Sequence, residues 1–198
     1  MVYINENTGE FDFEAALAEV SPQRREEALK FRYENGRRLS LAVYILLKKG
    51  LREEYGITEN PVFGYSAEGK PFILDRPDIH FSFSHSGNVA VCAISDQPVG
   101  VDVEVPRKIS SSLVNYTMND SEQAQINTSP DPMMQFLYFW TRKEALLKLT
   151  GEGIRNDMKK VLATAEKYRL ETVQTERYIY SVAKYNIFSE IDCRTSGL

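Results

Sequence analysis

Cysteine and histidine are both scarce in this chain of 198 residues, which contains only two of each. Cys92 lies in an apolar run and Cys193 lies near the C-terminus, so neither a disulfide framework nor a zinc site is predicted. We therefore expect a reducing, cytoplasmic location. The apolar run at residues 39–47 is interrupted by Ser40 and is too short to span a bilayer. Residues 1–10 are polar and acidic, which is not typical of a signal peptide.

The chain also lacks an excess of basic charge. Its formal net charge is -4, which gives no reason to expect nucleic acid as the main partner. The composition, 42% hydrophobic and 26% charged, is that of an ordinary globular protein. A chain of this length can form one large domain or two small ones, with ample apolar core for either.

The first half of the chain begins with helical signals. Ser21 followed by a proline is typical of an N-cap and the first residue of a helix. Apolar residues then recur at helical spacing as far as Leu47. We expect Gly36 to separate two helices and Gly50 to end the second, with one further turn at residues 51–55.

After these helices the pattern becomes that of strands. Phe81 and Phe83 alternate with polar residues, as on a strand with one buried face. Turn signals follow at residues 86–88 and 95–98. Three consecutive strands in an antiparallel meander are therefore predicted, at residues 80–84, 89–94 and 99–105.

The second half repeats this order of elements. Residues 106–131 are polar and are predicted to be a linker or surface segment with a short helix around residues 121–126. A helix that is apolar almost all round is expected from residue 133 to 150, where Gly151 ends it. Strands are expected at residues 169–173 and 178–185. The order of elements predicts an α+β fold with two halves, which we expect at residues 1–105 and 106–198.

A pair of acidic residues marks the third predicted strand. Asp102 and Glu104 are two positions apart, so their side chains point to the same face, while Val101 and Val103 hold the opposite face in the core. Such a pair can simply be the solvated face of an edge strand. The alternative is a site that uses the two carboxylates.

A third carboxylate lies in the apolar helix and favours the second interpretation. Trp140, Glu144 and Lys148 are spaced by four residues and form one stripe of the helix. Glu144 and Lys148 can be an ordinary surface ion pair, and Lys143 is either exposed to solvent or a phosphate ligand. If the three acids converge, however, each pair at about 4 Å repels by about 4 kcal/mol at an effective dielectric constant near 20. A cation such as Mg²⁺ reverses that sign and favours phosphoryl chemistry.

Other polar residues offer donors to an anion. Lys70, Ser84 and His85 bracket the first predicted strand and can contact a phosphate. His85 can also be a turn histidine that closes a hairpin. Arg24 and Arg38 can be solvated helix charges.

Four segments with a defined order and spacing identify a family. They are residues 69–71 (Gly-Lys-Pro), 81–87 (Phe-Ser-Phe-Ser-His-Ser-Gly), 100–104 (Gly-Val-Asp-Val-Glu) and 139–148 (Phe-Trp-Thr-Arg-Lys-Glu-Ala-Leu-Leu-Lys). Together they resemble the 4′-phosphopantetheinyl transferases of the Sfp type. The resemblance covers residues 21–154. Residues 116–122 carry one residue more than the family's aromatic-Ser/Thr-x-x-Glu segment, which lies near its carrier-docking surface.

The resemblance implies two α+β halves related by a pseudo-twofold axis, with coenzyme A bound in the cleft between them. It implies transfer of the phosphopantetheine arm to a serine of an apo acyl or peptidyl carrier protein, with release of adenosine 3′,5′-bisphosphate. A monomer is expected, because the two halves can complete a site within one chain.

The resemblance also implies roles for individual residues. The implied Mg²⁺ ligands are Asp102, Glu104 and Glu144. The implied coenzyme contacts are Lys70, Ser84, His85 and Lys148, with His85 near the 3′-phosphate and Arg24 and Arg38 helping to hold that end. Glu144 is the candidate base and Lys148 the candidate stabiliser of charge on the transferring group, and the two roles can be exchanged.

Two other functions compete with this one. A Mg²⁺-dependent hydrolase of phosphodiester or pyrophosphate bonds can use the same three carboxylates with water as the nucleophile. A binding module can keep the fold without activity, although the complete acidic set argues against it.

Overall fold

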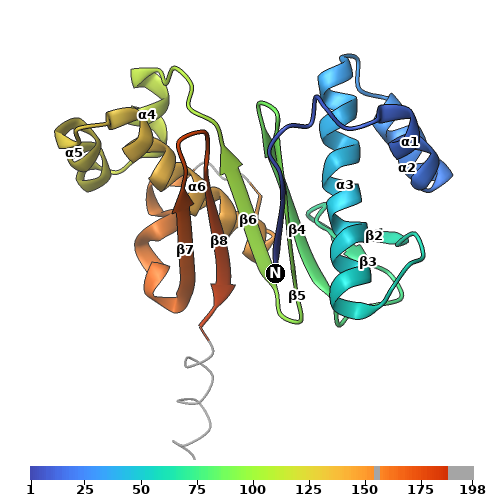
Figure 1. The fold of residues 1–198 in the computed structure, drawn as a ribbon. Coiled ribbons are helices and arrows are strands. Elements are labelled where there is room, and N and C mark those ends of the chain that lie inside the picture. The colour runs from blue at the N-terminus through green and yellow to red at the C-terminus, as the bar shows by residue number, and fades with distance from the viewer. Residues whose placement is uncertain (154–156, 187–198) are drawn as a thin grey trace, which may run out of the picture.

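The computed structural model describes residues 1–153 and 157–186, so Cys193 lies outside the described part. The first half packs helices on a three-stranded antiparallel sheet of order β1-β5-β4 (Figure 1). A short hairpin, β2–β3, lies beside it. The elements of this half are β1 (Val2–Asn5), α1 (Phe13–Glu19), α2 (Pro22–Leu29), α3 (Glu34–Tyr55), β2 (Phe63–Tyr65), β3 (Pro71–Ile73), β4 (His80–Ser86) and β5 (Val89–Ser95).

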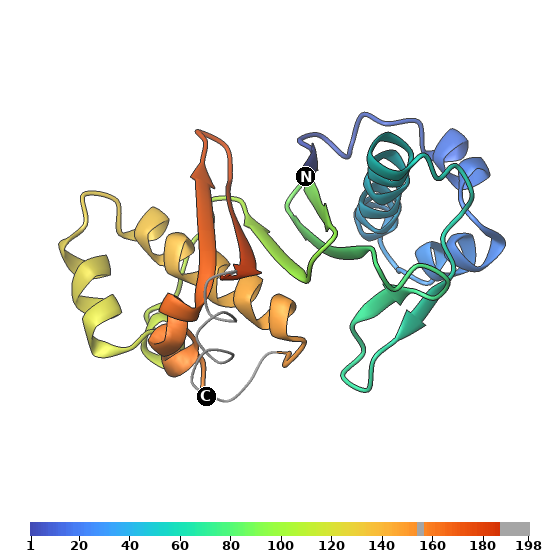
Figure 2. The same cartoon turned by 90° about the horizontal axis from the view of Figure 1, so that it is seen from below.

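The second half has a three-stranded antiparallel sheet of order β6-β8-β7, covered by the long helix α6. Its elements are β6 (Val99–Glu104), α4 (Ser111–Thr117), α5 (Asp120–Thr128), α6 (Pro132–Thr150), the 3₁₀ segment η1 (Met158–Lys167), β7 (Tyr168–Gln174) and β8 (Ile179–Tyr185). The predicted α+β fold with two similar halves is confirmed, since each half sets one long helix against three strands (Figure 2).

Strand β5 explains how the two halves share a core. Its residues Cys92 and Ile94 face α3, whereas Val91 and Ala93 belong to the apolar cluster that includes Val101 on β6. Both faces of β5 are therefore buried, which is why its sequence is apolar without alternation.

The predicted antiparallel meander is wrong at its third strand. Strand β4 pairs with β5, but β6 pairs with β8 in the other sheet, with Asp102 opposite Ser181. Strand β6 still runs beside β4, but the contact is made by serine hydroxyls of β4, which accept hydrogen bonds from backbone N–H groups of residues 101, 103 and 105. We propose that the halves divide in the turn at residues 96–98, in place of the predicted division after residue 105.

Two predicted helix boundaries are also wrong. Helix α3 contains Gly36 in its first turn and runs through Gly50 to Tyr55, where Gly56 adopts the left-handed conformation that ends it. Gly50 is needed for packing, because a Cβ atom there would lie 2.8 Å from the ring of Tyr3 on β1.

The predicted segment at residues 106–131 contains two helices: the short helix predicted around residues 121–126 is confirmed as α5, whereas α4 was not predicted. Ser110 caps α4, and Asn119 forms a capping box with Glu122 at the start of α5. Short polar sequences with these caps can form helices when one face packs against a neighbour, and Ile126 packs here against α6. Among the described residues no helix is long and apolar enough to cross a membrane.

Gly100 lets helix α6 lie directly on strand β6. A Cβ atom at this position would overlap the backbone carbonyl oxygen of Ala145 and lie 2.5 Å from the amide nitrogen of Leu149. The glycine of the Gly-x-Asp-x-Glu motif therefore sets the distance between the two elements that carry the acidic residues.

We expect Gly100→Ala to lower the free energy of unfolding by roughly 1–3 kcal/mol, because helix backbone cannot move aside as a flexible side chain can. Urea unfolding measures this. Gly9→Ala is the control, since its added methyl group would come no closer than 3.5 Å to any neighbour. Equal losses in the two variants would contradict the role given to Gly100.

Candidate active site

Asp102 and Glu104 lie on one face of β6, as predicted, but that face is not an exposed edge. Their exposed fractions are only 5% and 8%, and Val101 and Val103 are buried on the opposite face. The interpretation of this pair as a solvated strand face is therefore wrong. Buried carboxylates require partners, and the surrounding contacts show which ones these have.

The carboxylate of Asp102 has both of its hydrogen bonds on one oxygen. Oδ1 accepts from the Ser84 hydroxyl at 2.8 Å and from Lys148 Nζ at 2.7 Å. Oδ2 is buried and has no hydrogen-bond partner. Burial raises the pKa of Asp102, and the charge of Lys148 opposes that rise.

Glu104 is held by three donors. Ser86 donates to Oε2 at 2.7 Å, while Trp140 Nε1 and Arg107 Nη2 both donate to Oε1 at 3.1 Å. Burial raises the pKa of Glu104, and the charge of Asp102 adds to the rise. The orientation of this carboxylate is therefore fixed from both sides.

Glu144 on α6 completes the acidic group. It is 8% exposed, and its Oε1 atom is buried without a hydrogen-bond partner. Burial, followed by the charge of Asp102 and a smaller contribution from Glu104, raises the pKa of Glu144 to about 7, against the opposing charge of Lys148. The charges of Asp102 and Glu104 on β6 therefore act on Glu144 of α6, and a site shared by the three acids stays a prediction.

These residues fit a divalent cation. As the side chains stand in the described residues, no group of three His, Cys, Asp or Glu side chains could hold a metal ion. Yet Asp102 Oδ2 and Glu144 Oε1 are buried oxygens without partners, the charge of Asp102 raises the pKa of Glu104, and both of these charges raise the pKa of Glu144. Unpaired anionic oxygens in a crowded acidic group are the ligands that Mg²⁺ prefers.

The raised pKa of Glu144 predicts a pH-dependent stability. Its carboxyl group titrates from 4.5 in the unfolded chain to about 7 in the folded one, so folding favours the neutral form. The stabilisation is complete below the unfolded value and is lost as the pH rises through the folded value. The loss is at most about 3 kcal/mol.

Urea unfolding without added metal, between about pH 5 and about pH 8, tests this. We expect the wild-type protein to lose stability over this range and Glu144→Gln, which stays neutral, to lose clearly less. Identical pH dependence in both proteins would show that Glu144 does not titrate there.

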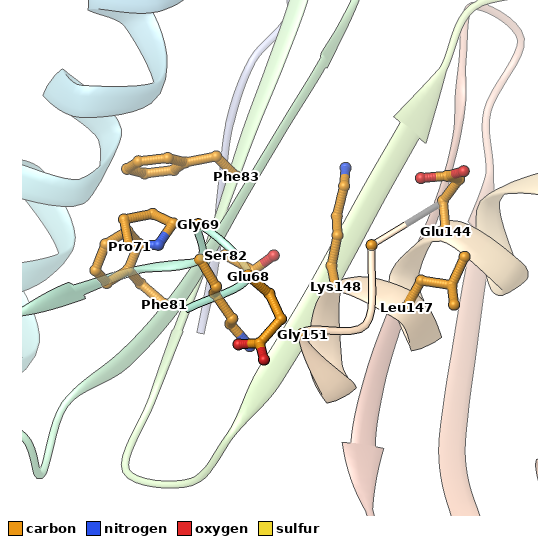
Figure 3. A pocket seen from close by; sticks show the side chains of 12 residues that line it. Glu68, Gly69, Pro71, Phe81, Ser82, Phe83, Glu144, Leu147, Lys148 and Gly151 are labelled. Atoms are coloured by element: carbon orange, nitrogen blue, oxygen red, sulfur yellow. The ribbon is translucent and has the colours of Figure 1, made fainter. Parts of the chain in front are cut away.

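A pocket of about 410 Å³ opens beside this acidic group (Figure 3). Its walls come from both halves, with Phe81 and Phe83 on β4, the loop that joins β2 to β3, and the C-terminal end of α6. Glu144 and Lys148 extend from α6 at the pocket wall. Lys70 crosses from the loop and donates through Nζ to the backbone carbonyl of Leu149 at 3.0 Å. Burial lowers the pKa of Lys70.

The other residues predicted to contact an anion differ in their exposure and in their hydrogen-bond partners. His85 is exposed next to the site, and the surrounding protein and the charge of Lys148 lower its pKa. Ser84 donates its only hydroxyl proton to Asp102. Arg24 packs over the ring of Tyr44 and donates a hydrogen bond to Ser40. Arg38 donates to Glu34 and to the backbone carbonyl of Phe11. These contacts do not bring either arginine to the acidic group.

Lys143 is neither exposed to solvent nor available to a phosphate. It is 0% exposed and donates through Nζ to Glu122 Oε2 at 2.6 Å and to the carbonyl of Thr117 at 2.7 Å. Both alternatives considered from the sequence are therefore wrong, because the partner lies in the segment taken for a linker.

Sequence reasoning also missed Ser86 and Arg107, which hold Glu104. A signal for Ser86 exists in the alternation of Ser82, Ser84 and Ser86 on one face of β4. No comparable pattern points to Arg107.

Known 4′-phosphopantetheinyl transferases are similar in sequence to this chain. Residues 7–97 match the family model "4′-phosphopantetheinyl transferase, N-terminal", and residues 98–186 match that of the 4′-phosphopantetheinyl transferase superfamily. Bacillus subtilis 4′-phosphopantetheinyl transferase Sfp is 26% identical over 156 residues, which is 77% of this chain and 70% of the relative. HetI, the 4′-phosphopantetheinyl transferase of a Nostoc species, is 32% identical over 166 residues, 78% of this chain and 70% of the relative.

Together the two models cover residues 7–186, and the similarity to HetI extends over more than two thirds of both proteins. The chain therefore belongs to the 4′-phosphopantetheinyl transferase superfamily and is a transferase of the Sfp type.

Proposed function

We propose that this protein moves the 4′-phosphopantetheine arm of coenzyme A onto a serine of an apo acyl or peptidyl carrier protein, with Mg²⁺, and releases adenosine 3′,5′-bisphosphate. The observation that carries the proposal is the buried acidic group of Asp102, Glu104 and Glu144 at the edge of a pocket that also contains Lys148. An acidic group beside a cation and an open pocket suits a diphosphate substrate.

We propose that the coenzyme binds in the pocket between the halves. Its diphosphate would lie near Lys148, and Lys70 and His85 would contact phosphate groups from the other wall. The apolar surface of Phe81, Phe83 and Leu147 suits the uncharged pantetheine arm. Arg24 and Arg38 stay proposals for the 3′-phosphate end, and Ser84 acts there only if it gives up its bond to Asp102.

Asp102, Glu104 and Glu144 would hold the magnesium ion. When bound, Mg²⁺ neutralises charge on the diphosphate and on the leaving phosphate. The chain's own contribution is to keep two of these carboxylates oriented by fixed donors and to bury one oxygen each of Asp102 and Glu144 away from water.

The transfer step assigns distinct roles to two residues of α6. The carrier serine's oxygen forms a bond to the phosphorus next to pantetheine, and the bond from that phosphorus to the adenosine bisphosphate oxygen breaks. Glu144 is the proposed acceptor of the serine proton, because its carboxylate lies at the pocket wall next to Lys148. Lys148 carries an ion pair with Asp102, which suits a charged group that stabilises the transferring phosphate.

A groove in the second half is the proposed carrier-docking surface. It encloses about 310 Å³ between α4, α5 and the start of α6. Its floor is apolar, with Ile109, Val114 and Phe136, and Lys108 lies at its edge. An acidic carrier surface with apolar side chains is complementary to it.

Intact-mass measurement of the products tests the function. The protein is incubated with coenzyme A and Mg²⁺, with and without an apo carrier protein, and a panel of fatty-acid, polyketide and peptide carriers is compared. A phosphopantetheine mass gain on the carrier supports the proposal. Cleavage of coenzyme A without carrier would identify a hydrolase, and neither product from any carrier would favour a binding module. The monomeric state and cytoplasmic location remain predictions.

A further inference from the structure

Three serines on one face of β4 form a regular seam with β6. The hydroxyls of Ser82, Ser84 and Ser86 accept the backbone N–H groups of Val101, Val103 and Val105 at 3.1, 3.2 and 3.2 Å. All three serines are buried. The two strands thus run side by side with side-chain hydroxyls in the place of backbone carbonyls.

This arrangement dictates where each hydroxyl proton points. A serine hydroxyl has one proton and two acceptor positions, and the backbone N–H occupies one of the latter. The proton of Ser84 goes to Asp102 and that of Ser86 to Glu104, each being the residue just before the valine that the same serine holds. At the corresponding place beside Ser82 stands Gly100, which has no side chain.

Ser84 and Ser86 therefore connect the contact between β4 and β6 with the carboxylates of Asp102 and Glu104. Glu104 is the clearer case, because Ser86 alone holds Oε2 while Trp140 and Arg107 share Oε1. A hydroxyl fixed by a backbone N–H cannot rotate to another acceptor without losing that bond. It is a more rigid support than the partly exposed Arg107 side chain.

We propose that Ser86 is a positioning residue that holds the Glu104 carboxylate in the orientation needed to bind the cation, as Ser84 does for Asp102. The cation part of this inference rests on the proposed function, whereas the positioning of Glu104 does not. Supporting groups around metal ligands commonly change metal affinity by about 10–100-fold when removed.

The test compares Ser86→Ala with Ser82→Ala, which loses the same kind of seam hydrogen bond but has no acid beside it. Ser86→Thr keeps the hydroxyl. The first readout is the indole N–H resonance of Trp140, the single tryptophan, which donates to Glu104 and so reports its orientation without metal or substrate. The second is binding of Mn²⁺ to the protein, followed by electron paramagnetic resonance.

We expect Ser86→Ala to shift the Trp140 resonance and to raise the Mn²⁺ dissociation constant by about tenfold or more. Ser82→Ala should leave both unchanged despite a similar loss of thermal stability, and Ser86→Thr should restore the wild-type resonance. An unshifted resonance in Ser86→Ala, or equal shifts in the two alanine variants, would overturn the positioning role. If the wild-type protein does not bind Mn²⁺, the metal proposal fails, and the resonance still decides the role of Ser86.

Discussion

Asp102→Asn is expected to reduce phosphopantetheine transfer by at least about a hundredfold while the protein stays folded. The side chain keeps its shape, but it loses the charge that would hold the cation and that pairs with Lys148 at 2.7 Å. Because burial already disfavours the ionised form of Asp102, a neutral replacement should not unfold the chain. Transfer to an apo carrier is measured by mass spectrometry, and folding by near-ultraviolet circular dichroism.

Asp78→Asn is the matched control for this experiment. Asp78 is an exposed carboxylate that pairs with Arg76 on the surface, so its loss should leave transfer unchanged. Retention of most activity in Asp102→Asn would mean that the metal ligands are wrongly assigned. A large loss in both variants would mean that the assay responds to any loss of charge.

The second large effect is on stability. Lys143→Met is expected to lower the free energy of unfolding by about 3–5 kcal/mol, because it leaves the Glu122 carboxylate buried without its cation. The carbonyl of Thr117 loses a donor in the same variant. Urea unfolding at neutral pH measures the change, and adding Glu122→Gln to the variant should recover part of it.

An exposed ion pair provides the comparison. Lys160 pairs with Asp157 at 2.8 Å, but these side chains are 79% and 54% exposed. Lys160→Met should therefore cost far less stability than Lys143→Met. If Lys143→Met costs no more than Lys160→Met, the buried pair does not stabilise the fold.

The Lys143 pair also bears on the site. Successive residues of a helix point about 100° apart, so α6 can direct Lys143 toward α5 while Glu144 faces β6. The buried contact with Glu122 fixes that rotation from one side, and the close approach of Gly100 fixes it from the other. Two structural constraints thus hold Glu144 at the pocket.

The parts of this structure that the sequence predicts are those set by local periodicity. Asp102 and Glu104 share a strand face because side chains alternate, and the end of α6 follows from the left-handed conformation of Gly151. The convergence of the strand acids with Glu144 was implied by the family resemblance, and it stays a prediction. The charges of Asp102 and Glu104 do contribute to the raised pKa of Glu144.

The parts that the sequence does not predict depend on distant partners. Turn signals stand both between β4 and β5 and before β6, and only the pairing with β8, about eighty residues away, decides the sheet to which β6 belongs. Lys143 looks like any lysine on a helix until Glu122 is placed beside it. Helix α4, which was not predicted, depends on its Ser110 cap and on apolar packing in a segment of low hydrophobicity.

Crystals grown with coenzyme A and Mn²⁺ offer the most direct test, through an anomalous difference map measured near the manganese absorption edge. The account predicts one peak in contact with carboxylate oxygens of both Asp102 on β6 and Glu144 on α6. A manganese peak bound elsewhere with coenzyme A in the pocket, or one that touches only one of these two residues, would contradict a catalytic cation held jointly by the strand and the helix.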